Sequence, residues 1–202
     1  MARNSTESAF MRKCSWFGAA AVISVTLGLL PACGTNSNDS SSARTDSRDS
    51  WQYPLRLGDA RARVHEILGN ATRTTEVLEE YPMSGVTVWF DSEGRLTKLN
   101  FHGEAGALYS GPNSMIGANW IPSDRPVLSG LTSHANEDDF RRLLGSPVRE
   151  YEAGPSNAKE VRRVWRYGGY LIDALFLVSD RTNEGKTFTK GSLVWFEVSP
   201  GR

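Results

Sequence analysis

One pattern occurs twice in this chain and limits the folds that the chain can adopt. In its first copy, Leu57-Gly58-Asp59 precedes apolar residues at the spacing of a short amphipathic helix. Asp59 is predicted to cap the start of this helix, and Gly69 is predicted to end it. Strands are then predicted at residues 86–90 and 96–101, so the copy reads as a helix followed by a β-hairpin.

The second copy repeats this order with clearer signals. Asn136 is predicted to begin a helix with an acidic first turn and a basic later turn, as the helix dipole favours, and Gly145 is predicted to end it. Gly168-Gly169 is a typical two-residue hairpin turn. The predicted strands of this copy are residues 161–167, 170–178 and 192–198, with a polar loop before the last one.

The repeat predicts an α+β protein of two similar units, each a short helix followed by antiparallel strands packed as a helix-on-sheet layer. We expect the first unit at residues 51–103 and the second at residues 131–202. Residues 104–130, rich in Gly, Pro, Ser and Asn, connect them, and their aromatic residues favour a linker that packs.

The N-terminus has the layout of a secretory signal over residues 1–33. Arg12 and Lys13 precede an apolar run of 15 residues from Trp16 to Leu30. A membrane-spanning helix needs roughly 18–20 such residues, so a cleaved signal is the better interpretation. Translation from Met11 would give a more compact signal than translation from Met1.

Leu30-Pro31-Ala32-Cys33 resembles the lipobox of bacterial lipoproteins, although Pro31 departs from the usual residue at its place. The resemblance implies cleavage before Cys33, acylation of that cysteine and anchoring to a membrane by lipid. Gly34 implies sorting to the outer membrane, with the folded part facing the periplasm. The alternative is ordinary secretion with Cys33 as a free thiol.

Residues 34–50 contain no large apolar side chain and are predicted to form a flexible tether. A random coil of this length spans on the order of 20–25 Å, enough to hold a domain clear of a lipid surface. No cysteine follows Cys33, so the folded part can form no disulfide, thiol nucleophile or thiolate metal site.

The order of Leu-x-x-Gly-Asp, short helix, Leu-Gly, loop and strands is similar to two known folds. One is the small lipoprotein of the outer-membrane β-barrel assembly machinery (BamE/SmpA-like), and the other is β-lactamase inhibitor protein. The tandem build looks more like the inhibitor, without its disulfide cysteines. A group of proteins resembling toxin-immunity factors also has the Leu-Gly helix followed by a Gly-Val-x-Val-x-Phe-Asp run, here residues 85–91.

Charge and motifs exclude several function classes. Removal of residues 1–33 takes three basic residues and one acidic residue from totals of 23 each, leaving 20 basic and 22 acidic residues and a net charge of −2. That balance argues against nucleic-acid binding. His65, His102 and His134 have no metal-ligand spacing, and no nucleotide-binding or serine-hydrolase motif occurs, so we expect no metal and no cofactor.

Acidic pairs could in principle form a hydrolase site. Glu79-Glu80 reads as part of a solvated loop, and Asp138-Asp139 reads as a helix first turn that matches the dipole. Adjacent residues on a helix point about 100° apart, so we expect that neither pair shares a site. We therefore expect no catalytic residues, while a hydrolase with an unrecognised site remains the third alternative.

Aromatic and arginine side chains are the candidate binding residues. Trp89, Trp165 and Trp195 lie on predicted strands, and Arg162 and Arg166 share one strand face that could meet a carboxylate-rich partner. Packing in the core, and a solvated face for the arginines, are the competing interpretations. The sequence thus favours a non-catalytic protein-binding lipoprotein, with envelope assembly first and immunity or inhibition of a secreted toxin or enzyme second.

Overall fold

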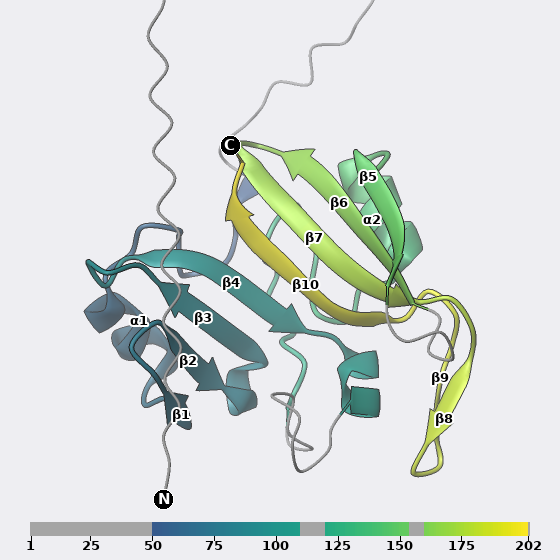
Figure 1. The fold of residues 1–202 in the computed structure, drawn as a ribbon, viewed down its shortest axis with the longest axis horizontal. Coiled ribbons are helices and arrows are strands. Elements are labelled where there is room, and N and C mark those ends of the chain that lie inside the picture. Colours follow the sequence, from purple (N-terminus) through teal and green to yellow (C-terminus); the bar gives the residue numbers. More distant parts are fainter. Residues whose placement is uncertain (1–49, 110–119, 154–159, 202) are drawn as a thin grey trace, which may run out of the picture. The chain divides into compact units, whose positions relative to one another are not determined.

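The described residues form one large antiparallel sheet and one small sheet. The computed structural model describes residues 50–109, 120–153 and 160–201, which belong to a compact unit spanning Arg44–Arg202. The predicted signal, Cys33 and all of the predicted tether except Ser50 lie outside the described residues. The large sheet has eight strands in the order β1-β2-β3-β4-β10-β7-β6-β5, and β8 and β9 pair separately (Figure 1).

The elements have the following bounds. The large sheet comprises β1 (Arg73–Thr74), β2 (Leu78–Tyr81), β3 (Val86–Phe90), β4 (Leu96–His102), β5 (Arg149–Ala153), β6 (Glu160–Tyr167), β7 (Tyr170–Leu177) and β10 (Leu193–Pro200). The small sheet comprises β8 (Arg181–Asn183) and β9 (Lys186–Phe188). The helices are α1 (Arg61–Leu68) and α2 (Glu137–Leu144), with 3₁₀ turns η2 (Pro82–Ser84) and η3 (Glu104–Tyr109).

This architecture corrects the predicted fold class, because the strands do not divide into two helix-on-sheet units. β4 of the first predicted unit pairs with β10 of the second, with Phe101 opposite Phe196. Their rings stack with centroids 4.8 Å apart, and both are fully buried. Two separate sheets would each leave an open edge beside these rings, whereas pairing the edges satisfies the backbone groups and buries the apolar surface.

The end of β4 shows how closely the two halves approach. A Cβ atom on Gly103 would lie 2.3 Å from the carbonyl oxygen of Leu193, closer than any side chain permits. The Gly103 N–H donates to the carbonyl of Val194 at 2.9 Å. Glycine at this position therefore lets the chain leave β4 directly beside β10.

Both predicted helices are present, but they begin differently. Asn136 caps α2 in a capping box with Asp139. The Asp139 N–H donates to the side-chain oxygen of Asn136 at 3.0 Å, and the Asn136 N–H donates to the carboxylate of Asp139 at 3.1 Å. At α1 the predicted cap is wrong, since Ala60 occupies the cap position and Asp59 instead accepts from the N–H of Arg56 at 2.7 Å. Glycine follows the last helical residue in both, as predicted.

The predicted hairpins are confirmed. β3 and β4 pair antiparallel, as do β6 and β7, and Gly168 and Gly169 join the latter with φ of 56° and 82°, which favours glycine. The predicted polar loop before β10 differs, because it contains the β8–β9 hairpin. Glu79 and Glu80 were also misplaced by the prediction of a solvated loop, since both lie on β2 and are buried.

One face of the large sheet is apolar, and the other carries most of the polar side chains together with a second, smaller apolar cluster of Ala105, Leu175, Leu177, Phe188 and Val194. The core face packs against α1 and α2, which contribute Val64 and Phe140 to the larger cluster. It carries Val86, Val88, Leu99, Phe101, Val198, Phe196, Ile172, Ala174, Phe176 and Trp165. The opposite face, called the polar face below, carries Thr87, Trp89, Lys98, Asn100, Trp195, Glu197, Asp173, Arg162, Arg166, Arg149 and Tyr151.

Candidate functional site

The polar face brings together four of the five binding residues predicted from the sequence. Trp89, Trp195, Arg162 and Arg166 all lie on it, contributed by β3, β10 and β6. Trp165 lies on the core face, fully buried, and its indole N–H donates to the carbonyl of Gly145 at 3.0 Å. Alternation along β6 separates Trp165 from the two arginines, so it cannot reach the same partner.

Arg162 lies on the part of the polar face nearest β10, where two contacts with Asp173 fix its guanidinium. Its Nε donates to Asp173 at 2.6 Å, and its terminal nitrogen contacts the second carboxylate oxygen. The hydrogen bond with Asp173 raises the pKa of Arg162 above its ordinary value. The guanidinium lies 5.4 Å from the Trp195 ring and 5.6 Å from the Tyr151 ring, so one cation orders two aromatic side chains.

A second cation and aromatic pair lies on the β3 side. The Lys98 ammonium is 5.0 Å from the Trp89 ring and 3.3 Å from the carboxylate of Glu197. Burial raises the pKa of Glu197, against the opposing effect of Lys98. Glu197 is directly opposite Asp173 in the sheet. These two carboxylates therefore separate the Trp195–Arg162 pair from the Trp89–Lys98 pair. Both tryptophans are half-buried, and Trp195 packs against the second apolar cluster, which includes Leu175 and Val194.

A hollow lies on the polar face beside the outer strand. It has a volume of about 390 Å³ and is lined by Val148, Arg149, Tyr151, Val164, Arg166, Leu171 and Asp173. Its apolar floor and two guanidinium groups suit a partner side chain that is partly apolar and negatively charged. Sequence reasoning missed Arg149, because nothing in the sequence showed that β5 pairs with β6 and places it beside Arg166.

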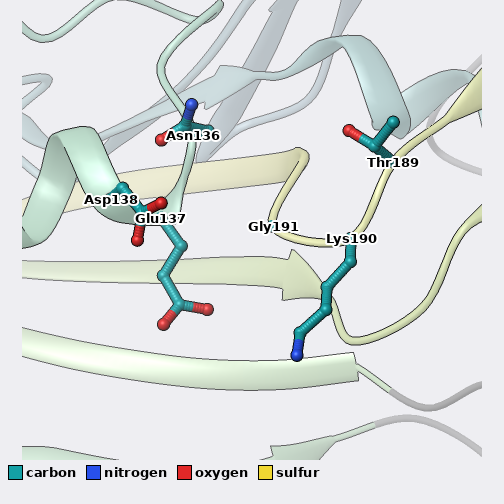
Figure 2. A pocket seen from close by; sticks show the side chains of 6 residues that line it. All are labelled: Asn136, Glu137, Asp138, Thr189, Lys190 and Gly191. Carbon is teal, nitrogen blue, oxygen red and sulfur yellow. The ribbon is translucent and has the colours of Figure 1, made fainter.

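A second hollow lies at the start of α2, away from the predicted binding residues. Asn136, Glu137, Asp138, Thr189, Lys190 and Gly191 line its volume of about 420 Å³. Figure 2 shows the side chains of Glu137 and Lys190 extending in the same direction from the helix start and from the loop before β10. An adjoining hollow of about 480 Å³ shares these two residues.

Two of the acidic groups near this second hollow, Glu137 and Asp139, are already used by the fold. Glu137 accepts from Arg141 at 3.0 Å and pairs with the buried Arg163 at 2.9 Å. The hydrogen bond from Arg142 lowers the pKa of Asp139, which also closes the capping box. These contacts fix α2 on the sheet, so we do not assign a ligand to the hollow.

The histidines serve three different local roles. The His65 ring nitrogen lies 2.9 Å from Glu79, a carboxylate that is only 1% exposed and that also accepts from the Tyr81 hydroxyl at 2.6 Å. This cluster joins α1 to β2. Its signal was hidden in the sequence, since Leu78-Glu79-Glu80-Tyr81 lacks the alternation of a half-buried strand.

His134 and His102 each contact residues of the segments that follow β4. The two ring nitrogens of His134 each lie 2.8 Å from a carboxylate oxygen, one of Glu104 and one of Asp124. His102 contacts the Thr87 hydroxyl at 3.0 Å and packs on the Trp120 ring, with centroids 3.7 Å apart. Burial lowers its pKa to about 4.

Within residues 50–109, 120–153 and 160–201, no group of three or more His, Cys, Asp or Glu side chains could hold a metal ion. No helix in the same part of the chain is long and apolar enough to cross a membrane.

Comparison with known proteins gives one distant structural neighbour. No protein-family model matches the chain, and no curated protein matches it. Among solved structures, the chain is similar to YjgB, a DUF4309 family protein from Bacillus subtilis, at 13% identity and a TM-score of 0.37. The match covers 70% of this chain and 78% of YjgB, and a likeness of this size supports no inference about fold or function.

Proposed function

We propose that this chain is a lipid-anchored envelope lipoprotein that binds another protein without catalysing a reaction. The observation that carries the proposal is the polar face, which presents Trp89 and Trp195 beside Lys98 and Arg162. Tryptophan and arginine dominate the energetics of protein interfaces, because they combine large apolar contact with directed hydrogen bonding.

The arrangement of the polar face supports binding more than simple solvation. Solvated sheet faces are covered adequately by small or flexible polar residues, whereas here cations hold large rings in fixed positions. Side chains ordered in advance lose less conformational entropy when a partner binds. Glu197 and Asp173, which lie between the two tryptophan–cation pairs, are themselves paired with Lys98 and Arg162. An apolar partner surface would therefore not meet an unpaired charge at the centre of the polar face.

The two histidine–carboxylate clusters of the described residues favour a structural role over catalysis. The His65–Glu79 cluster links α1 to β2, and His134 links Glu104 to Asp124. Neither pair lines the hollows described above, where a substrate would have to lie. The proposal therefore assigns these groups to stability.

The anchor and tether determine where binding takes place. We propose acylation of Cys33 at the outer membrane, with residues 34–50 holding the folded part in the periplasm. The partner is then an envelope protein, with assembly of the envelope as the first candidate process.

The test is a pull-down from mild detergent of the tagged full chain, expressed with its own signal in a Gram-negative host. Cys33→Ala is expected to move the protein from the membrane to the soluble periplasmic fraction. The double variant Trp89→Ala, Trp195→Ala is expected to lose the partner, while Met83→Ala, which removes a 74% exposed apolar side chain elsewhere, keeps it.

The identity of the captured protein separates the candidate processes. Envelope-assembly components lost with the tryptophans would support an assembly role. One stoichiometric secreted enzyme or toxin, lost in the same way, would support immunity or inhibition. A partner that the tryptophan variant retains would contradict binding through the polar face.

A further inference from the structure

The outer strand β5 offers backbone groups for a further strand. Within the described residues, β5 pairs with β6 on one side and has no strand on the other. Tyr151 on this strand is 43% exposed, and Val148 just before it is 54% exposed. An exposed edge of this kind is where an extended peptide adds to a sheet by main-chain hydrogen bonds.

The side chains beside this edge carry positive charge on the polar face. Arg149 and Arg166 both line the hollow there, and the hollow's one acid, Asp173, is already neutralised by Arg162. Arg149 is exposed, and within the described part of the chain its guanidinium has no ion-pair partner. Because Arg162 is paired with Asp173, Arg149 is the better placed of these two arginines to meet an acidic partner.

We propose that β5 is the docking edge for an extended acidic segment of the partner protein, which adds as a ninth strand. This inference rests on the proposed function and specifies the chemistry of its partner. In an added strand, the residue opposite Arg149 has its side chain on the polar face. A glutamate or aspartate there reaches Arg149 directly, and the long Arg166 side chain approaches from β6.

The other face of β5 restricts the partner sequence further. Glu150 and Glu152 are both exposed and alternate with Arg149 and Tyr151, so they lie on the core-face side. Glu150 is paired with Arg163 and Arg141, whereas Glu152 has no ion-pair partner within the described residues. An acidic residue opposite Glu152 on the added strand would therefore be repelled. The edge favours an acidic residue opposite Arg149 and a neutral or basic residue opposite Glu152.

The test uses short blocked peptides of seven residues and the purified full chain in mild detergent. The probe carries glutamate at alternate positions with threonine between, and the control carries lysine in place of each glutamate. Binding is followed by fluorescence anisotropy at low salt. We expect the glutamate peptide to bind and the lysine peptide not to bind.

Matched variants and modified peptides locate the contact. Arg149→Glu should weaken binding of the glutamate peptide at least about tenfold, the loss expected for one charge-assisted contact. Arg95→Glu, which reverses an exposed arginine on the β3–β4 turn, should leave it unchanged. N-methylation of the threonine amides and of the glutamate amides should differ in effect, because only one set of amides faces β5. Circular dichroism checks that both variants are folded.

Three results would overturn the inference. The first is equal binding by both N-methylated peptides, which would show that main-chain pairing is not used. The second is no peptide binding although the pull-down partner depends on Trp89 and Trp195, which would leave the proposed function intact. The third is binding of phosphatidylglycerol vesicles, lost in Arg149→Glu, without peptide binding, which would assign the arginines to a lipid surface.

Discussion

Phe140 is the side chain through which α2 contributes most to the core, so its removal tests the described packing. Phe140→Ala deletes a fully buried ring that lies 5.2 Å from Phe176 and 5.4 Å from both Trp165 and Phe196, measured between centroids. Loss of a buried aromatic ring costs about 3–5 kcal/mol, including the cavity that remains. The higher helix propensity of alanine returns about 0.5 kcal/mol.

The expected net loss in the free energy of unfolding is therefore about 2.5–4.5 kcal/mol. For a domain of this size, that loss lowers the thermal midpoint by roughly 5–18 °C. Urea unfolding followed by circular dichroism measures the change, with Asp138→Ala on the exposed side of α2 as control, expected to cost no more than about 1 kcal/mol. A loss below about 1 kcal/mol for Phe140→Ala, with an unchanged urea dependence, would refute the packing of α2 on the core face.

The remaining predictions concern the α2 cap and pH. Asn136→Ala removes the capping box and should cost about 1 kcal/mol in urea unfolding, whereas Ala60→Ser, which gives α1 the side-chain cap it lacks, should stabilise by a few tenths to about 1 kcal/mol; equal effects of both changes would contradict the assigned caps. Burial lowers the pKa of His102 to about 4, so its neutral form stabilises the fold fully above the unfolded pKa of about 6.5, and this stability of about 3 kcal/mol is lost as pH falls from 6.5 to 4. His102→Gln should flatten unfolding free energy against pH in this window, and an unchanged slope would contradict the buried neutral ring.

Local structure could be predicted from the sequence because its signals lie within a few residues. Asn136 and Gly145 mark the ends of α2, and Gly168-Gly169 marks the turn between β6 and β7. The cap of α1 was misassigned because Asp59 can also accept a backbone N–H within its own turn, and that competing bond is the one formed.

Long-range structure could not be predicted in the same way. The pairing of β4 with β10 depends on two edges far apart in the chain, and neither sequence marks the other as its neighbour. For the same reason the sequence did not indicate Arg149 as a binding residue. It also suggested Trp165 and Trp195 equally as binding residues, although Trp165 is in the core and Trp195 is on the polar face. Burial of Glu79 depends on donors from α1 and β2 together, which no local pattern reports.

The position of β10 has a consequence for how the chain reaches its native state. β10 follows β5 to β9 in sequence yet lies between β4 and β7. The two hairpin regions can form early from local contacts, but the sheet stays in two parts until this strand has been synthesised and has inserted between them. Such non-local closure slows folding and leaves two strand edges open to other chains in the meantime. Shortening the chain from its C-terminal side would therefore remove the strand that unites the sheet, rather than trim its border.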